Sequence, residues 1–522
     1  GMEDISDDYF TWANAVVEKV LLKYPDKWFG TLAYNGLAEP PTKVSVNPRI
    51  VPFITYDRMR WGDPKIRQQG QELTERWAAA APVIGWYDYA YGMTCLLPRV
   101  YFHRVQQYLS WGAAHHVKFH YAELYPNWGT GPKAWVYAKL LWNPNQDVDA
   151  LLDDWYTHFA GPKAAPKLKD YYAIWEKFWS VDIFKSKFHT DKYQYMLLST
   201  EPRYLMDVPK SDITRADADM NAALQLADTP LRKARVAEMK KMWEYFKITL
   251  NVYQAANSSD YPQSEKQALT FLDKAADVMT QVKKREEMRE ELAKDPLYKD
   301  TAGYLTSIDI AGARWGESLI WRVLPWAEKY PSVKTKLQTL TQSSDADVAA
   351  QASKILQAAS GKVTLVSTNG SFEEGVKDWN VWDKGGDGEG YHKGQSAVST
   401  DKAHSGTHSL MVQGMERGAA IQTIPYQAGN YIAKAYVYAP SASNLSAASL
   451  TVGATGDGAP ANLLHSDVPL RPGVWSSVVV PFSLPELKTD KPGTLRFMLV
   501  VDGLNPDTKI YIDDVEIYKL NP

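Results

Sequence analysis

The chain has 522 residues, more than one hydrophobic core usually serves, so we expect several domains. Its formal net charge is −3, which argues against a nucleic-acid-binding protein because such proteins concentrate basic residues on one face. Its single cysteine excludes an intrachain disulfide and zinc sites built on cysteine pairs. No apolar run reaches the roughly 18 residues that a transmembrane helix needs.

The clearest compositional excess is aromatic, with 19 Trp and 31 Tyr residues. Such rings combine a large apolar surface with a polar group, and the C–H face of a sugar ring lies flat on them. Many of them are expected to be core residues. The remainder favour carbohydrate as a partner.

The first region predicts a helix followed by four strands. Residues 7–24 place Phe10, Ala13 and Val17 at helical spacing and end before Pro25. Strands that alternate with helices favour a parallel sheet of TIM-barrel type. A (β/α)8 barrel needs twice as many strands, so we expect residues 1–146 to form the C-terminal half of such a barrel, either as part of a longer barrel or completed by another element. The predicted strands are residues 28–34, 50–57, 82–92 and 116–125.

Two further domains are expected. Residues 147–362 contain successive segments with apolar faces at helical spacing and predict an α-helical bundle. Ser264 and Gln267 form a predicted capping box within it. Residues 363–522 contain short alternating runs between Gly, Asn and Pro turns, which predicts a β-sandwich of jelly-roll type.

Three of the four predicted strands end in a carboxylate, namely Asp57, Asp88 and Glu123. The ends of parallel strands meet on one rim, so we expect these groups to converge there. One protonated and one ionised carboxylate can hydrolyse a glycoside. Arg58 would keep Asp57 ionised, and Glu123, near apolar rings, is the better acid. The alternative for each is a structural carboxylate that caps a loop or pairs with Arg or Lys. The residues expected to contact sugar near this rim are Tyr34, Arg58, Trp86, Tyr89, Tyr125 and Trp128.

Residues 5–350 resemble a bacterial family of unknown function that is grouped near α-glucuronidase-like and hexosaminidase-like glycoside hydrolases. The most specific stretch is AKLLWNPNQDVDALLDDWYTHFAG, residues 138–161. The resemblance implies a (β/α)8-type barrel followed by a helical region. By strand order it assigns Asp57 and Asp88 to the positions of base-type carboxylates. The acid of the related hydrolases often lies on the fourth strand, which would fall in the half barrel that this chain lacks.

The last region resembles a galactose-binding-like carbohydrate-binding module. This resemblance implies a structural Ca²⁺ held by Glu373 with Asp513 or Asp514, since carboxylate oxygens suit that ion. The ring candidates for sugar stacking are Trp379, Trp382, Tyr391 and Trp475. Of these, Trp382 and Tyr391 are expected to be exposed, whereas the favoured alternative for Trp379 and Trp475 is a place in the core. The stretches that carry the resemblance are residues 369–379, 403–412, 431–440, 475–485 and 510–518.

These observations predict a glycoside hydrolase, or a fragment of one, that acts on a polysaccharide or glycan without a catalytic cofactor. The alternative is a non-catalytic carbohydrate-binding or scaffold protein of a glycan-utilisation system. A third hypothesis is an assembly protein that pairs through the edge of its half barrel. We expect an extracellular, periplasmic or cell-surface protein whose signal peptide is not part of this sequence. The oligomeric state stays open.

Overall fold

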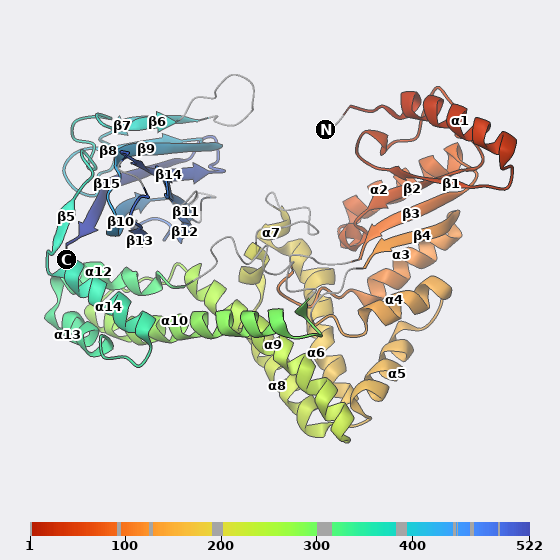
Figure 1. The fold of residues 1–522 in the computed structure, drawn as a ribbon, viewed down its shortest axis with the longest axis horizontal. Helices are drawn as coiled ribbons and strands as arrows, with labels where there is room; N and C mark the ends of the chain where they lie inside the picture. Colours follow the sequence, from red (N-terminus) through yellow and green to blue (C-terminus); the bar gives the residue numbers. More distant parts are fainter. Residues whose placement is uncertain are drawn as a thin grey trace. The chain divides into compact units, whose positions relative to one another are not determined.

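The computed structural model of the chain forms two compact units, residues 1–250 with 288–311 and residues 251–287 with 312–522 (Figure 1). The N-terminal region is rich in helices, and the C-terminal region consists of antiparallel sheets. The predicted helical domain contributes helices to both units. No described helix is both long and apolar enough to cross a membrane. The structure describes residues 3–90, 95–124, 129–190, 202–299, 316–382, 394–441, 445, 447–459, 464–488 and 491–521.

The four predicted strands of the first unit form one parallel sheet in the order β1-β2-β3-β4. Helix α2 (Pro64–Ala80) connects β2 to β3, and α3 (Phe102–Ala114) connects β3 to β4. The expected alternation of strands and helices is therefore confirmed for these strands. A TIM barrel is not confirmed, because the described strands form a four-stranded sheet with β1 and β4 at its ends. The strands are β1 (Phe29–Ala33), β2 (Ile50–Tyr56), β3 (Ile84–Tyr89) and β4 (Val117–Glu123).

Local sequence signals account for where the first helices begin and end. Helix α1 (Ser6–Lys23) ends just before Pro25, as predicted. The Asp63 carboxylate accepts the backbone N–H groups of Lys65 and Ile66 at 2.8 and 3.2 Å and so caps α2. The further helices of this unit are α4 (Lys133–Trp142), α5 (Val148–Ala160), α6 (Ala165–Lys177), α7 (Lys187–Thr190) and α8 (Lys210–Leu226), and the boundary between the units falls within α9 (Pro230–Ala256) and α10 (Glu265–Lys294).

Helices α2 and α3 pack on one face of the sheet, with Trp86 of β3 at the centre of the contact. Its indole is fully buried and lies 5.6, 6.3 and 6.2 Å from the rings of Trp61, Tyr108 and Trp111, measured between centroids. The indole nitrogen donates a hydrogen bond to the Thr74 hydroxyl of α2 at 3.3 Å. This layer of rings joins both helices to the sheet.

Gly112 of α3 lies directly against the Trp86 indole, and a Cβ at position 112 would lie 2.5 Å from its nearest carbon. Because the surrounding rings prevent the indole from moving away, Gly112→Ala is expected to lower the free energy of unfolding by about 1–3 kcal/mol, although Ala is the better helix former. Hydrogen exchange of β3 amides measures the loss. The matched control is Ala113→Ser on the exposed side of α3, which should cost at most about 0.5 kcal/mol. Unchanged protection in Gly112→Ala would mean that the ring layer can rearrange.

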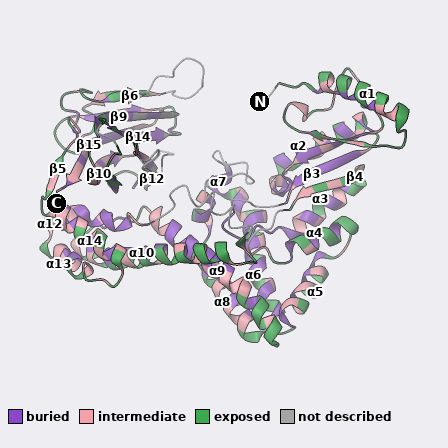
Figure 2. Ribbon diagram, in the orientation of Figure 1, coloured by how far each residue is buried: buried purple, intermediate pink, exposed green. Residues whose placement is uncertain are grey.

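The opposite face of the sheet carries rings that are half-buried or exposed. The strand register places Phe53, Gly85 and Phe119 side by side, and Phe53 lies over Gly85, where a Cβ would be 2.7 Å from the phenyl ring. Phe119 and Tyr121 are 49% and 55% exposed. In Figure 2, β2 and β3 are mostly buried whereas β4 is intermediate or exposed.

The C-terminal part of the second unit contains two antiparallel sheets, consistent with the predicted β-sandwich. One has the order β13-β10-β15-β8-β7, with β5 paired to β15, and the other has the order β12-β11-β14-β9-β6. Apolar side chains of both sheets, among them Val437, Phe497 and Ile512, share one core. The strands are β5 (Val363–Leu365), β6 (Asn380–Trp382), β7 (Gln395–Ser399), β8 (Ser409–Gln413), β9 (Arg417–Pro425), β10 (Gly429–Tyr438), β11 (Ala447–Thr455), β12 (Leu464–Pro469), β13 (Trp475–Leu484), β14 (Thr494–Asp502) and β15 (Lys509–Leu520).

Helices precede the sandwich in this unit. The predicted capping box opens α10: the Ser264 hydroxyl accepts the N–H of Gln267 at 3.3 Å, and the Gln267 side chain accepts the N–H of Gln263 at 2.7 Å. In a standard capping box the side chain of Gln267 would accept the backbone N–H of Ser264, whereas here it accepts that of Gln263, one residue earlier. The remaining helices are α12 (Leu324–Lys329), α13 (Pro331–Leu340) and α14 (Ala346–Ala359).

Candidate functional site

The strand-end carboxylates Asp57 and Asp88 lie in buried ion pairs. Asp57 accepts hydrogen bonds from Arg99 at 3.1 and 2.9 Å. Asp88 lies 3.8 Å from the Arg58 guanidinium and accepts the backbone N–H groups of Arg58 and Tyr89 at 3.2 and 2.9 Å. The predicted pairing of Arg58 with Asp57 is therefore wrong, because Arg99, distant in sequence, binds Asp57 instead.

Arg58 and Trp86 belong to the core of the first unit. Both are fully buried, and the guanidinium lies 4.0 Å from the centroid of the indole. It also donates hydrogen bonds to the backbone carbonyls of Ile54 and Tyr87 at 3.0 and 3.2 Å. The sugar contacts predicted for Arg58 and Trp86 are therefore corrected: these side chains hold the ends of β2 and β3 and present no surface to a ligand.

Another buried basic residue, Lys133 of α4, lies near these ion pairs, and none of the described carboxylates pairs with it. Lys133 is 3% exposed, and within the described residues its side-chain nitrogen makes no hydrogen bond. It lies 5.0 Å from the ring centroid of Tyr101. Burial, and then the charge of Arg99, hold the pKa of Lys133 well below its usual range, which favours the neutral amine. The nearby Cys95 thiol is also buried, which raises its pKa to about 11 and marks it as unreactive.

Glu123 and Asp88 lie on opposite faces of the sheet. The register pairs Glu123 with Tyr89, so Glu123 and Asp88 point to opposite faces because successive side chains of a strand alternate. Glu123 accepts a hydrogen bond from the Tyr87 hydroxyl. The expected convergence of three carboxylates is wrong for this reason, and because Asp57 is buried against Arg99.

The remaining predicted contacts of the first unit fall into two groups. Tyr34 is 43% exposed, and Tyr89 is half-buried beside it; burial, followed by the Tyr34 hydrogen bond, raises the pKa of Tyr89. Both lie with Glu123 on the face of the sheet opposite to α2 and α3. Tyr125 and Trp128, together with Tyr391 of the second unit, lie outside the described residues.

The predicted calcium ligands accept hydrogen bonds from one loop, residues 404–408. Glu373 accepts the backbone N–H groups of Thr407 and His408 at 2.7 and 2.8 Å. The hydrogen bond from the His408 ring, followed by these backbone bonds, lowers the pKa of Glu373 to about 2. The loop is therefore bound to an ionised carboxylate at one of its ends.

Asp513 and Asp514 bind the other end of the loop. Asp513 accepts the N–H groups of His404 and Ser405 at 2.6 and 3.2 Å, and Asp514 bonds the Ser405 hydroxyl and the His404 ring nitrogen, each at 2.6 Å. A calcium ion needs about six to eight oxygen ligands. Among the described residues, no group of three or more His, Cys, Asp or Glu side chains could hold a metal. As placed, these carboxylates fit a hydrogen-bonded clamp rather than a cation site, and calcium binding stays a prediction.

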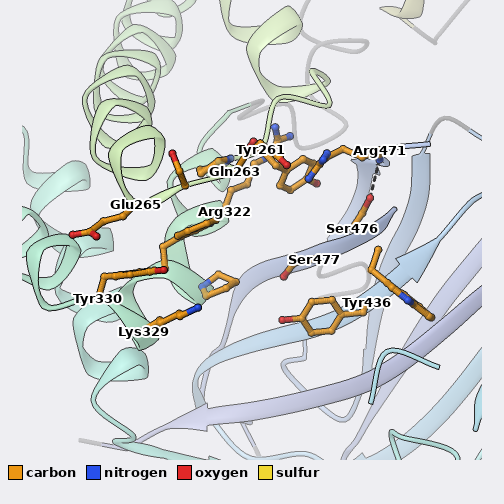
Figure 3. Close-up of a pocket in the computed structure, with 15 residues that line it drawn as sticks. Tyr261, Gln263, Glu265, Arg322, Lys329, Tyr330, Tyr436, Arg471, Ser476 and Ser477 are labelled. Carbon is orange, nitrogen blue, oxygen red and sulfur yellow. Dashed lines mark hydrogen bonds between the residues drawn. The ribbon is translucent and has the colours of Figure 1, made fainter. Parts of the chain in front are cut away.

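A cleft of about 600 Å³ lies in the second unit, between its helices and the outer face of the sheet that contains β10 and β13 (Figure 3). The helical side contributes residues from the start of α10 and from α12, and the sheet side contributes residues of β10, β13 and the turn before β13. Half-buried rings come from both sides. The rings that line the cleft are Tyr261, Trp326, Tyr330, Tyr436 and Trp475.

The sheet side of the cleft is built by neighbouring strands. Both neighbours of Tyr436 along β10 are buried, so Tyr436 points away from the core. Its β13 partner is Ser477, while Trp475 is paired with Tyr438, whose ring lies 5.7 Å from the indole. His404 stacks on Tyr436 at 3.5 Å. The strand ladder and this stacking thus fix the two rings that the sheet presents to the cleft.

A half-buried arginine fixes the helical side of the cleft. The Arg322 guanidinium donates hydrogen bonds of 2.6–3.0 Å to three backbone carbonyls within residues 256–260 and lies 4.4 Å from the ring centroid of Tyr261. The Tyr261 hydroxyl in turn donates to the Pro469 carbonyl of the sandwich at 2.8 Å. These contacts join the helical wall of the cleft to the sheet.

The chemistry of the cleft suits binding rather than hydrolysis. Among the described residues that line it, the only carboxylate is Glu265, which accepts a hydrogen bond from the Ser332 hydroxyl. Most glycosidases need two carboxylates that face one space. Flat rings beside hydroxyl groups, such as those of Ser476 and Ser477, offer stacking and hydrogen bonds to a polyhydroxylated ligand.

For the ring residues of this unit, the prediction of a buried side chain is confirmed for Trp379 and is wrong for Trp475. Trp379 is buried, as expected, and its indole nitrogen donates to the carbonyls of Thr368 and Asn369 at 3.2 and 3.0 Å. Trp475 was expected in the core but lines the cleft. Trp382 is the last residue of β6, but its side chain lies outside the described part of the structure, so its predicted sugar contact stays a prediction. The alternation in residues 431–440 is the signal that could have identified Tyr436.

Two regions of the chain match known families. Residues 1–173 match the model described as "Domain of unknown function (DUF4838)", and residues 366–506 match CBM_4_9, described as "Carbohydrate binding domain". The second match includes Tyr436 and Trp475 of the cleft. No curated protein matches the chain.

Several solved structures are similar to about a third of the chain. The Family 16 Carbohydrate Binding Module-2 is 17% identical over 30% of this chain and 99% of that chain, with a TM-score of 0.22. The CBM22-1 xylan-binding domain from Paenibacillus barcinonensis Xyn10C is 15% identical over 29% and 92%, with a TM-score of 0.23. An arabinose-bound α-L-arabinofuranosidase, MgGH51, is 14% identical over 30% and 26%, with a TM-score of 0.23. Similarity this low does not transfer a ligand to this chain.

The match of residues 366–506 covers most strands of the two antiparallel sheets, and the match of residues 1–173 covers the parallel sheet and its helices. The chain therefore contains a region that matches the DUF4838 model, followed further along by a region that matches the CBM_4_9 carbohydrate-binding model.

Proposed function

We propose that the protein binds a carbohydrate in the cleft of the second unit, as a non-catalytic binding protein of a glycan-utilisation system. The observation that carries this proposal is the pair of half-buried rings, Tyr436 and Trp475, that the carbohydrate-binding domain presents to a cleft of about 600 Å³. A sugar can stack its C–H face on such rings. A polysaccharide ligand agrees with an extracellular, periplasmic or cell-surface location.

Hydrolysis by the first unit has weaker support. Glu123 lies on an aromatic face beside Tyr87, but Asp57 and Asp88, the other two predicted catalytic groups, are buried against arginines. A half barrel completed elsewhere would supply the second carboxylate that hydrolysis needs. Release of reducing ends by the full chain, lost in Glu123→Gln, would favour this function over simple binding.

The test of the binding function is affinity electrophoresis of the full chain against a panel of soluble neutral and acidic polysaccharides. We expect at least one polymer to retard the wild type, and Tyr436→Ala/Trp475→Ala to weaken that binding by about tenfold to a hundredfold, because both stacking surfaces are removed. Trp142→Ala is the matched control, since it removes an indole that is 91% exposed on α4, outside the cleft.

The competing sugar platform within the same domain is Trp382. If Trp382→Ala abolishes binding and the double variant binds like the wild type, the ligand lies elsewhere on the sandwich and the proposed cleft is wrong. Circular dichroism of each variant establishes that the sheets are retained.

A further inference from the structure

We propose that the sugar bound in this cleft carries a carboxylate, as a hexuronate does; the inference rests on the proposed binding function. Of the residues that the structure describes, three cationic side chains line the cleft, Arg322, Arg471 and Lys329, against the single carboxylate of Glu265. A cleft with an excess of one charge and walls of low polarity concentrates ligands of the opposite charge.

Two of the three cations are available to a ligand. Arg322 is engaged by backbone carbonyls of residues 256–260. Within the part of the chain that the structure describes, Arg471 and Lys329 have no ion-pair partner. The acidic neighbour of Lys329 in α12, Glu328, pairs with Lys434 at 3.4 Å and so does not neutralise it.

The free cations come from both walls of the cleft. Figure 3 shows Arg471 on the sandwich side and Lys329 on the helical side. The ammonium of Lys329 lies 5.3 Å from the ring centroid of Tyr330, which also lines the cleft. A ligand between the walls would therefore meet positive charge from both sides.

Arg471 is held close to the stacking surface by its backbone. Its N–H donates to the Ser476 hydroxyl at 2.7 Å (dashed in Figure 3), which closes the turn that leads into Trp475, the first residue of β13. Gly473 within this turn has a φ of +78°, a backbone conformation that favours glycine. Arg471 and Trp475 therefore belong to one turn whose backbone is constrained.

This combination of groups favours a carboxylated sugar over a neutral one. A guanidinium binds a planar carboxylate through two parallel hydrogen bonds, while a neighbouring indole stacks on the sugar ring. A neutral sugar would leave Arg471 and Lys329 without a counter-charge. The net charge of the chain is −3, so general attraction of polyanions to the protein does not account for binding at this cleft.

The experiment compares the binding of the full chain to polygalacturonate, polyglucuronate and alginate with its binding to the same polymers after chemical reduction of the carboxyl groups. We expect at least one polyuronate to bind about tenfold or more tightly than its reduced form, with an advantage that falls as salt is added. Arg471→Gln should remove this advantage, so that the polyuronate and its reduced form bind equally tightly to the variant. The matched control is Arg496→Gln, at an exposed position of β14 that does not line the cleft.

Each outcome separates the two proposals. Equal binding of polyuronates and reduced polymers, or a polyuronate preference that survives Arg471→Gln, overturns the carboxylate inference and leaves carbohydrate binding in place. Binding of dextran sulfate at the strength of the best polyuronate shows general anion attraction and also overturns it. Absence of binding to every neutral and acidic polymer overturns the proposed function itself.

Discussion

Replacement of Arg99 by methionine is expected to lower the free energy of unfolding of the first unit by about 3–5 kcal/mol. Arg99 donates to both carboxylate oxygens of Asp57 and to the backbone carbonyl of Tyr89. Arg99→Met leaves the Asp57 charge buried without a partner. Burial already raises the pKa of Asp57, an effect that Arg99 opposes, so this pKa should rise further in the variant.

The measurement is hydrogen exchange resolved to peptides of β2 and β3, because it reports the local stability of this unit. The matched control is Arg76→Met, which breaks the ion pair with Glu39 at 2.9 Å, where both side chains are about half exposed. An exposed pair contributes about 0–1 kcal/mol. Asp57→Asn/Arg99→Met should lose less stability than Arg99→Met, since no unpaired charge remains. A cost below about 1 kcal/mol for Arg99→Met would mean that water reaches Asp57.

Replacement of Lys133 by methionine is expected to stabilise the same unit, by about 1–3 kcal/mol or more near pH 6. Its side-chain nitrogen is buried and makes no hydrogen bond within the described residues. Methionine has a similar length and brings no polar group. Lys139→Met, at an exposed position of the same helix, is the control and should change stability by at most about 0.5 kcal/mol.

The pH dependence distinguishes this cause from better packing. Lys133 faces Arg99, Cys95, Asp57 and Asp88, and its pKa in the folded protein is lowered, so the unfolded chain binds a proton that the native state does not. The stability of the wild type should therefore rise with pH, by up to about 1.4 kcal/mol per pH unit, until the unfolded-state pKa near 10.4 is reached. The advantage of Lys133→Met should shrink over the same interval. An advantage that is constant with pH would show that Lys133 titrates normally.

The cleft needs residues from outside the range that matches the carbohydrate-binding domain. The matched range contributes Tyr436, Arg471 and Trp475, whereas Trp326 and Lys329 come from α12, outside that range. The sandwich alone would therefore present an open aromatic surface instead of a cleft with two walls. Binding studies accordingly need the whole chain.

The sequence by itself determined the local elements. The spacing of Phe10, Ala13 and Val17 predicted α1, the alternating runs predicted the strands of both regions, and Ser264 predicted the start of α10. Such patterns are readable because helix and strand periods repeat within a few residues and a side chain can cap only nearby N–H groups. The carbohydrate-binding region was equally accessible, since its strands and turns follow one another along the chain.

Only the tertiary structure decided which charged and aromatic groups are available to a ligand. Asp57 was predicted to be catalytic, but its partner Arg99 comes from another part of the chain, and the pair is buried. Asp88 and Glu123 were expected on one rim, but the strand register turns them to opposite faces. The cleft joins residues 261–265, 322–330, 436 and 471–477, which no local pattern relates. Packing and register, rather than residue type, separate a buried ion pair or a core ring from a binding surface.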